Sequence, residues 1–391
     1  MHPISRGRRG KPLQNLVIVC YTTILSFSAL YAPQPILPLL SAEFGIGPSQ
    51  ASLLITVTLL PLGVAPVAYG YILEAVPAKT LLRRAVLLLA LSELPLLLVD
   101  SFWVLVATRL AQGLLLPAIL TSLMTYLSTM TEPERLKRTM SIYIAATILG
   151  GFLGRVMSGT IASFGDWRIT FLVLLIGLIG SYALLFRLEA DAPARFARLS
   201  GNAIAAVLQD RAFVKGYLVI FLSFFTFASL LNLLPFRLLE LDQTVSTFAI
   251  AMVYSGYLIG VVVALGSVAL SRRLGGELRA IVLALTVFLV AVVLFAIPNL
   301  PMVFVTMWVF CAGMFLVHSV LSGLLNHRAS QRKGVVNGIY ISSYYLGGTI
   351  GSYLPAYIYR HLGWEWYIAS LGLLVGLAIT IAGSLKRDLG E

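Results

Sequence analysis

The apolar residues of this chain are grouped in long runs that alternate with short polar segments. Most runs are about 20 residues long, the length that a helix needs to cross a bilayer core of roughly 30 Å. Spanning segments of this length predict helices, because a helix satisfies its own backbone polar groups in lipid. The pattern therefore predicts an all-α membrane protein with twelve transmembrane helices, at residues 14–39, 50–72, 81–99, 102–127, 139–163, 169–186, 216–238, 246–270, 280–297, 301–325, 335–358 and 366–384.

Composition and charge agree with this prediction. The 391 residues are 59% hydrophobic and only 11% charged, whereas a soluble domain carries about 25% charged residues. The net charge of +12 would fit a nucleic-acid-binding protein, but the basic residues fall in alternate loops. With the N-terminus placed inside, the Lys and Arg residues that are not in cytoplasmic loops are Arg109, Arg155, Arg168, Arg237 and Arg360. This asymmetry predicts cytoplasmic N- and C-termini and excludes nucleic acid as a partner.

One sequence pattern occurs twice in the chain. Residues 143–154 read YIAATILGGFLG, and residues 340–351 read YISSYYLGGTIG, at an offset of 197 residues. The same offset pairs Trp167 with Trp364. Each copy contains three glycines, which we expect to permit close helix approach rather than to perform chemistry. They are Gly150, Gly151, Gly154, Gly347, Gly348 and Gly351.

The duplication predicts the domain organisation. The longest polar break is basic and central, as expected of a cytoplasmic linker at residues 187–215. It separates an N-terminal six-helix bundle at residues 1–186 from a C-terminal six-helix bundle at residues 216–391. Parallel repeats of this kind are typical of secondary transporters that bind substrate at the midplane between the two halves.

Two charged residues lie in apolar runs at the same predicted depth. Glu93 and Arg109 are about equally far from the turn at residues 100–101, so both lie roughly 10 Å below the outer surface. Buried charge is costly and is kept mainly where it faces protein or water. One hypothesis is a static ion pair, or an Arg109 side chain that extends to the interface. The other is that Glu93 exchanges a proton under the control of Arg109.

Arg155 is a third charged residue in an apolar run, and the matching residue of the second copy is Ser352. Because the repeat accepts a hydroxyl at this position, helix packing alone does not require arginine. Arg155 is therefore a candidate anchor for an anion or a carbonyl group. With Arg109 and Arg155 offset only by Glu93, the site would be positive and would favour anionic, zwitterionic or neutral amphiphilic substrates over cations.

Several uncharged residues are weaker candidates for substrate contact. Gln34 corresponds to Asn232, and Tyr31 to Ser229, at an offset of 198 residues; hydrogen bonds between helices are an equal alternative for them. His318 can titrate near neutral pH, but a lone histidine in a helix is more often structural. Tyr344 and Tyr345 either line an aromatic pocket or pack in the core.

These motifs resemble the major facilitator superfamily and, within it, the drug:proton antiporter branch. RLAQG at residues 109–113 is similar to that branch's arginine motif, which implies proton coupling or substrate binding for Arg109 and places Gln112 beside it. GGFLGRVMSG at residues 150–159 resembles the antiporter motif, with Arg155 in place of a proline.

The segment GYILEAVPAKTLLRR at residues 70–84 resembles the superfamily's cytoplasmic gate motif. Pro77 and Ala78 replace the expected Gly and Arg, so we expect the gate salt bridge to be weaker or differently made. The C-terminal copy is LSRRLGGELR at residues 270–279. The positions that match the motif are Gly70, Glu74, Lys79, Arg272, Arg273 and Gly275.

The resemblance implies a monomeric transporter of the bacterial inner membrane that works by alternating access and exports a small amphiphilic compound against protons. The alternative is uptake or facilitated diffusion of an organic anion. A second alternative is a non-transporting membrane protein on the same fold. No clustered nucleophile, base or metal-ligand set indicates an enzyme, a cofactor or a metal, and no phosphate loop indicates ATP. Cys20 and Cys311 lie in apolar runs and predict neither a disulfide framework nor a zinc site.

Overall fold

The computed structural model describes residues 11–191, 201–329 and 333–389, and within these ranges the chain is helical without strands. The first part comprises α1 Lys11–Tyr31, η1 Gln34–Ile36, α2 Leu37–Glu43, α3 Pro48–Ala75, α4 Ala78–Leu91, α5 Glu93–Leu98, α6 Phe102–Met130, α7 Pro133–Phe164 and α8 Ile169–Leu185. The second part comprises α9 Gly201–Gln209, α10 Arg211–Leu241, α11 Thr247–Val253, η2 Tyr254–Gly256, α12 Tyr257–Arg273, α13 Glu277–Leu294, α14 Leu300–Arg328, α15 Lys333–Tyr353, α16 Pro355–Leu362 and α17 Trp364–Leu389.

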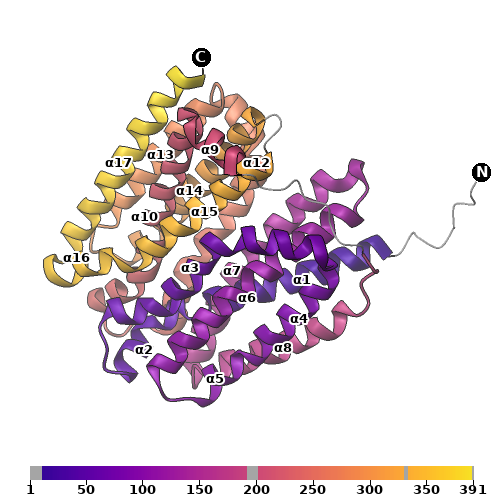
Figure 1. The fold of residues 1–391 in the computed structure, drawn as a ribbon. Coiled ribbons are helices and arrows are strands. Elements are labelled where there is room, and N and C mark those ends of the chain that lie inside the picture. The colour runs from indigo at the N-terminus through magenta and orange to yellow at the C-terminus, as the bar shows by residue number, and fades with distance from the viewer. Residues whose placement is uncertain (1–10, 192–200, 330–332, 390–391) are drawn as a thin grey trace, which may run out of the picture.

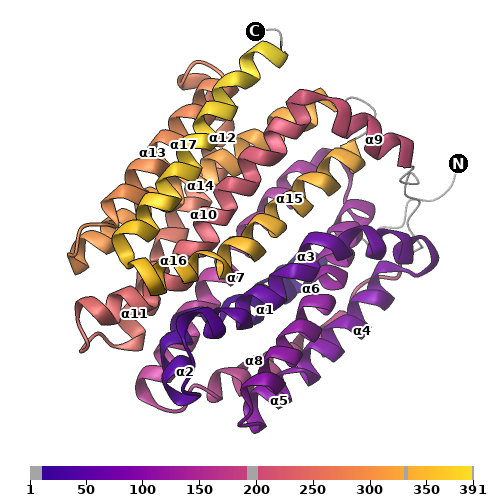
Figure 2. The same cartoon turned by 60° about the vertical axis from the view of Figure 1, so that its left-hand side comes forward.

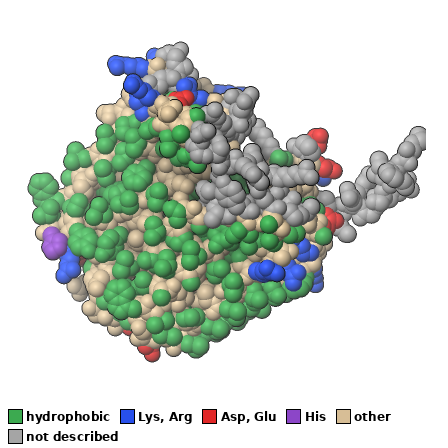
Figure 3. Space-filling view, viewed as in Figure 1, with side chains coloured by type: hydrophobic (Ala, Val, Ile, Leu, Met, Phe, Trp, Pro, Cys, Tyr) green, Lys and Arg blue, Asp and Glu red, His purple; other side chains and the backbone are tan. Residues whose placement is uncertain are grey.

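The predicted all-α membrane fold is confirmed, and each predicted span coincides with one helix or with consecutive short helices. Within the described ranges, nine helices are long and apolar enough to cross a membrane. Large apolar side chains such as Leu373, which is 76% exposed, remain on the surface of the protein. Figure 3 shows such side chains covering most of the visible face, with Lys and Arg near its margins. This surface suits contact with lipid rather than water.

Prolines explain why some predicted spans are not single helices. Pro33 has no N–H to donate to the carbonyl of Ala29, so α1 ends at Tyr31 and a 3-10 turn leads into α2. Pro95 likewise removes the donor to Leu91, and the third span bends at Ser92 between α4 and α5. The breaks matter because they free carbonyl oxygens inside the protein.

The helices pack in two groups (Figures 1 and 2). In the N-terminal group α1 packs on α7 and α3 on α6; in the C-terminal group α10 packs on α15 and α13 on α14. The two groups meet where α3 contacts α15 and where α7 contacts α11 and α12. In Figure 2 α9 and the C-terminal end of α17 lie at one end of the molecule, and α2, α5, α11 and α16 lie at the opposite end, named below the distal end.

The repeated glycines lie at corresponding helix contacts in the two groups. A Cβ atom on Gly154 of α7 would lie within 3.0 Å of the backbone of Ser28 on α1. A Cβ atom on Gly351 of α15 would likewise lie within 3.0 Å of the backbone of Phe225 on α10. Gly150 and Gly347 repeat this relation one turn earlier, against Ile24 and Phe221. The facing residues are thus related by the same offset as the glycines themselves.

Replacing Gly351 by alanine is expected to destabilise the protein by about 1–3 kcal/mol, because the added methyl group forces α15 away from α10. Gly338→Ala in the same helix is the matched control, since a Cβ atom there meets nothing within 4 Å. Thermal unfolding of the purified variants in detergent measures the difference. Equal unfolding temperatures for the two variants would show that the contact tolerates separation.

Candidate functional site

Arg155 is fully buried, at 0% exposure, in the distal third of α7. Its Nε donates to Gln34 Oε1 at 2.7 Å, its Nη1 to the carbonyl of Gly151 at 2.6 Å, and its Nη2 to the hydroxyl of Tyr257 at 3.1 Å. The guanidinium carbon also lies 4.2 Å from the ring centroid of Tyr31, 4.5 Å from that of Tyr257 and 4.9 Å from that of Tyr254. Three tyrosine rings and neutral oxygens therefore surround this cation.

Among the described residues, no ion pair involves Arg155. Cation–π contacts and hydrogen bonds to neutral groups lower the cost of burying the charge, but they do not neutralise it. The residues around Arg155 come from both helix groups, since Gln34 and Tyr31 belong to the N-terminal group and Tyr254 and Tyr257 to the C-terminal group. The arrangement can accept an anion at the boundary between the two groups.

Gln34 connects Arg155 to the C-terminal group. Its Nε2 donates to Asn232 Oδ1 on α10, and the Nδ2 of Asn232 donates to the carbonyl of Ser352 at 3.4 Å. The hydroxyls of Ser352 and Thr56 lie 2.7 Å apart. Gln34 and Asn232 correspond at an offset of 198 residues, and Arg155 and Ser352 at the offset of 197 residues. The axis that relates two such repeats therefore passes near this pair of amide side chains.

Arg109 has a different environment, although it is almost as deeply buried at 1% exposure. Its Nη1 donates to the carbonyl of Ala29 at 2.8 Å and its Nη2 to that of Leu30 at 2.5 Å, at the end of α1. Its Nε donates to the carbonyl of Leu54 at 2.9 Å. The carbonyl of Ala29 is free because Pro33 cannot donate to it, and a cation is favourable at a helix C-terminus.

Glu93 is fully buried at the first turn of α5, and neither of its carboxyl oxygens has a hydrogen-bond partner. Arg109 and Gln112 lie close enough to act on it electrostatically. Within the described part of the chain, however, no ion pair joins Glu93 to Arg109. The static ion pair was one form of the structural hypothesis drawn from the sequence, and in its place the guanidinium donates to three backbone carbonyls and to Gln112. Gln112 accepts from Arg109 at 2.6 Å and has an unpartnered Nε2.

The aromatic candidates lie together in the C-terminal group. Tyr344 stacks on Phe224 with ring centroids 3.6 Å apart, and Tyr345 contacts both rings edge-on. His318 lies against Tyr344, and its Nδ1 is 3.1 Å from the hydroxyl of Tyr340. These contacts place His318 in a hydrogen-bonded aromatic cluster rather than beside a charged group.

Tyr254 and Tyr257 belong to the site but were not identified from the sequence. Both occur in the eighth span, at the 3-10 turn η2 and the start of α12. A signal was available, because the matching residues of the first copy are the aliphatic Val57 and Leu60. The difference between the two copies at Arg155 indicated a functional residue, and the same comparison would have indicated the two tyrosines.

The gate-motif residues lie at the junctions of α3 with α4 and of α12 with α13, at the end opposite the distal end (Figure 2). Lys79 Nζ donates to the carbonyl oxygens of Phe186 and Leu188, and the Asp191 carboxylate accepts from the backbone N–H groups of Ala78 and Lys79. Partial burial, and then the charge of Arg83, lower the pKa of the Lys79 ammonium, while Asp191 acts in the opposite direction. The first residues after α8 are thus fastened to the start of α4.

The other gate positions are placed only in part. Gly70 and Glu74 lie in α3, and only the helical backbone is described at these two positions. Arg272 and Arg273 end α12, where cations suit the helix C-terminus. Gly275 has a φ of 86°, which a side chain would strain, and it forms the turn into α13.

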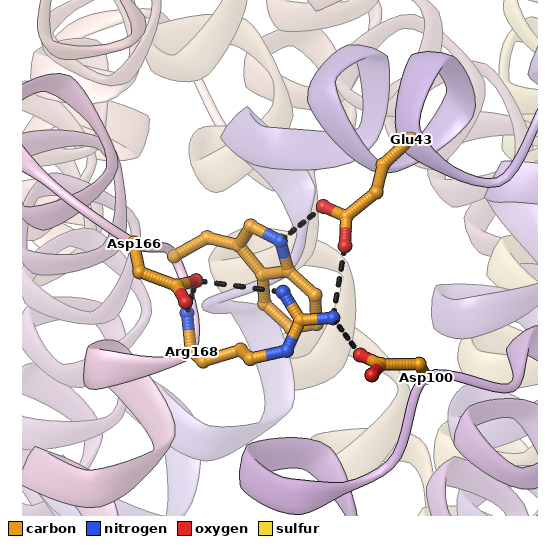
Figure 4. A network of polar contacts seen from close by, with 5 residues as sticks. Glu43, Asp100, Asp166 and Arg168 are labelled. Carbon is orange, nitrogen blue, oxygen red and sulfur yellow. Dashed lines mark hydrogen bonds and ion pairs between the residues drawn. The ribbon is translucent and has the colours of Figure 1, made fainter.

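A separate polar network fixes the distal end of the N-terminal group (Figure 4). The guanidinium of Arg168 contacts Glu43 at 2.8 Å, Asp166 at 3.6 Å and also Asp100, and Trp167 Nε1 donates to Glu43 at 2.6 Å. Partial burial acts to lower the pKa of Arg168, but the carboxylates outweigh it and raise that pKa. The network joins the end of α2 to the loops after α5 and α7 and does not touch Arg155.

The chain is similar to known proteins over nearly its whole length. The family model described as Major Facilitator Superfamily matches residues 19–351. The chain is 27% identical to Inner membrane transport protein YnfM of Escherichia coli (strain K12), covering 98% of this chain and 93% of that protein. It is 24% identical to the MFS-type transporter YybF of Bacillus subtilis (strain 168), with coverage of 97% and 96%.

Solved structures show the same architecture. A bacterial homologue of the human lysosomal transporter Spinster, in an inward-facing conformation, matches with a TM-score of 0.82 at 12% identity and covers 98% of both chains. The nucleoside transporter NupG matches with a TM-score of 0.75 at 12% identity, covering 96% of this chain and 98% of that one.

Proposed function

The chain belongs to the Major Facilitator Superfamily and is therefore a membrane transporter rather than an enzyme; from this premise we propose that it exports a small amphiphilic, neutral or anionic compound in exchange for protons. Residues 1–186 and 216–391 move as the two bodies of an alternating-access cycle, with residues 187–215 as their linker. The protein acts as a monomer in the bacterial inner membrane, with both termini in the cytoplasm. RLAQG supports assignment to a drug:proton antiporter-like branch.

The observation that carries the substrate proposal is the buried, unpaired charge of Arg155. An arginine at 0% exposure, with neutral partners from both helix groups, is an electrostatic site without a counter-ion among the described residues. An anionic group bound there would supply the missing charge and form charge-assisted hydrogen bonds. A cationic compound would be repelled, which argues against cationic drugs as substrates.

The observation that supports proton coupling is the environment of Glu93. Glu93 is fully buried and its carboxyl oxygens form no hydrogen bond within the described residues, so ionising this group is costly. If Glu93 carries the proton, a change in the α1–α6 contact that frees Arg109 would favour release of that proton. The break between α4 and α5 lies directly beside Glu93 and offers a place where the third span can bend.

Replacing Glu93 by glutamine is expected to abolish transport driven by a proton gradient but to spare exchange of substrate for substrate. Glutamine keeps the size of the side chain and cannot carry a proton. Proteoliposomes supplied with radiolabelled hippurate, an organic anion of low passive permeability, measure both activities. Glu134→Gln, at an exposed position of α7, is the matched control. Full gradient-driven transport by the Glu93 variant would remove Glu93 as the proton carrier.

Uptake or facilitated diffusion of an organic anion is the second candidate function, because the positive site itself does not require a coupled proton. A pH-sensitive dye inside the vesicles separates the two functions. Antiport changes the dye signal when hippurate is added, whereas uniport moves hippurate without that change. Lack of hippurate transport in either assay would count against the organic-anion proposal as a whole.

A further inference from the structure

Two edges of the Arg155 guanidinium have different partners. Nη1 binds the carbonyl of Gly151, which belongs to the same helix. Nε and Nη2 form the side edge of the planar group, and this edge binds Gln34 Oε1 and the hydroxyl of Tyr257. A carboxylate binds arginine through two parallel N–H groups, and the side edge presents such a pair. Two neutral oxygens therefore occupy a position that suits a carboxylate.

The same edge takes part in the contacts that hold the two helix groups together. In the described part of the chain, hydrogen bonds between the groups are confined to the distal half of the spans: Arg155 to Tyr257, Gln34 to Asn232, Thr56 to Ser352, and the Phe248 backbone N–H to Ser163. The first of these bonds is made by the side edge itself. The second is made by Gln34, whose oxygen that edge holds in place.

Building on the proposed function, we propose that a carboxylate takes the side edge of Arg155 from Gln34 and Tyr257 and thereby releases the distal contact between the two helix groups. The bond from Arg155 to Tyr257 breaks directly. Gln34 loses the partner that orients its amide toward Asn232. Gln34 and Tyr257 are thus positioning residues that couple occupancy of the site to opening at the distal end.

The strengths of the competing bonds favour this exchange. The N–H groups of Arg155 already donate as a cation, and a carboxylate adds to these bonds the attraction of an opposite charge, which the oxygens of Gln34 and Tyr257 lack. A ligand can shift a conformational equilibrium only through a difference in affinity between the two states. This difference arises because the carboxylate cannot bind the side edge while Gln34 and Tyr257 remain on it. A neutral amide of the same shape lacks the charge and should not displace them.

The test uses disulfide formation across the distal contact of the full chain. Cysteines replace Thr56 and Ser352, whose hydroxyls lie 2.7 Å apart, and the native cysteines are replaced as Cys20→Ala and Cys311→Ala. A protease site in residues 187–215 allows cross-linked and open chains to be distinguished on a gel. The rate of cross-linking in detergent is measured with benzoate, indole-3-acetate or hippurate, and with benzamide as the neutral control.

Carboxylates are expected to slow cross-linking by about tenfold, equivalent to 1.4 kcal/mol, and benzamide is expected to have no effect. Arg155→Ser should remove the effect, and Arg155→Lys should remove most of it, because an ammonium cannot present two parallel N–H groups. Cross-linking that none of the three carboxylates slows would overturn the proposal, even if hippurate is transported. Slowing that persists in Arg155→Ser would overturn it as well. A lack of hippurate transport in the proteoliposome assays would count against the proposed function, whereas the cross-linking rates test the displacement at Arg155.

Discussion

Replacing Arg155 by serine, the residue at the matching position of the repeat, is expected to weaken binding of organic anions about a hundredfold. A hydrogen bond to a charged group contributes about 1.5–3 kcal/mol, so loss of two such bonds costs about 3 kcal/mol or more. The fold should survive, because the substitution also removes an uncompensated buried charge. Concentration dependence of hippurate exchange in proteoliposomes measures the affinity.

Arg360→Ser serves as the control for Arg155→Ser, since it removes an exposed cation from the distal end. Its effect on hippurate affinity should be small, because exposed charges are screened by salt. An Arg155→Ser variant with unchanged affinity would mean that the arginine serves helix packing alone. Arg155→Lys with an intermediate affinity would indicate that charge and bidentate geometry both contribute.

Replacing Arg109 by alanine is expected to destabilise the protein more than replacing Gly351, Glu93 or Arg155. The change removes the donors to the carbonyls of Ala29 and Leu30 at the end of α1. Each buried carbonyl left without a partner costs about 1–3 kcal/mol, so the total is roughly 2–6 kcal/mol before any cavity cost. Thermal unfolding in detergent measures the loss.

The matched control for Arg109→Ala is Arg84→Ala, at an exposed position of α4. Arg109→Lys should be intermediate, because an ammonium can reach fewer of the carbonyls in their present geometry. A stable Arg109→Ala variant that fails only in proton-driven transport would contradict a structural role for Arg109 in holding the end of α1 against α6. It would instead support Arg109 as a group that acts mainly on Glu93.

Much of the fold could be predicted from the sequence, because lipid requires long apolar helices and proline interrupts them for a known reason. The equal depth of Glu93 and Arg109 follows from helix rise alone. Their lack of pairing could not be predicted, because the groups that hold Arg109 are backbone carbonyls, which every residue carries. Only the end of α1 at Pro33 makes them available, and their use by Arg109 depends on where α1 lies relative to α6.

The site was predictable to the extent that the two copies differ. Arg155 differs from Ser352, and this difference indicated a role beyond packing. The equivalence of Gln34 and Asn232 was also visible, but their contact was not. A sequence repeat gives the relation between two halves without the position of the axis that relates them. Tyr254 and Tyr257 were missed because aromatic residues are common in apolar helices.

The contact between Gln34 and Asn232 has a consequence for how the two copies can diverge. In an ancestral assembly of two identical halves, a residue on the twofold axis would face its own copy, as in an isologous dimer interface. A lysine or an aspartate there would repel itself. A carboxamide is both donor and acceptor, so it can bind an identical group. The amides at this position are a pair that a symmetric ancestor could have used, and they leave each half free to carry its own chemistry on the neighbouring helix, Arg155 in one half and Ser352 in the other.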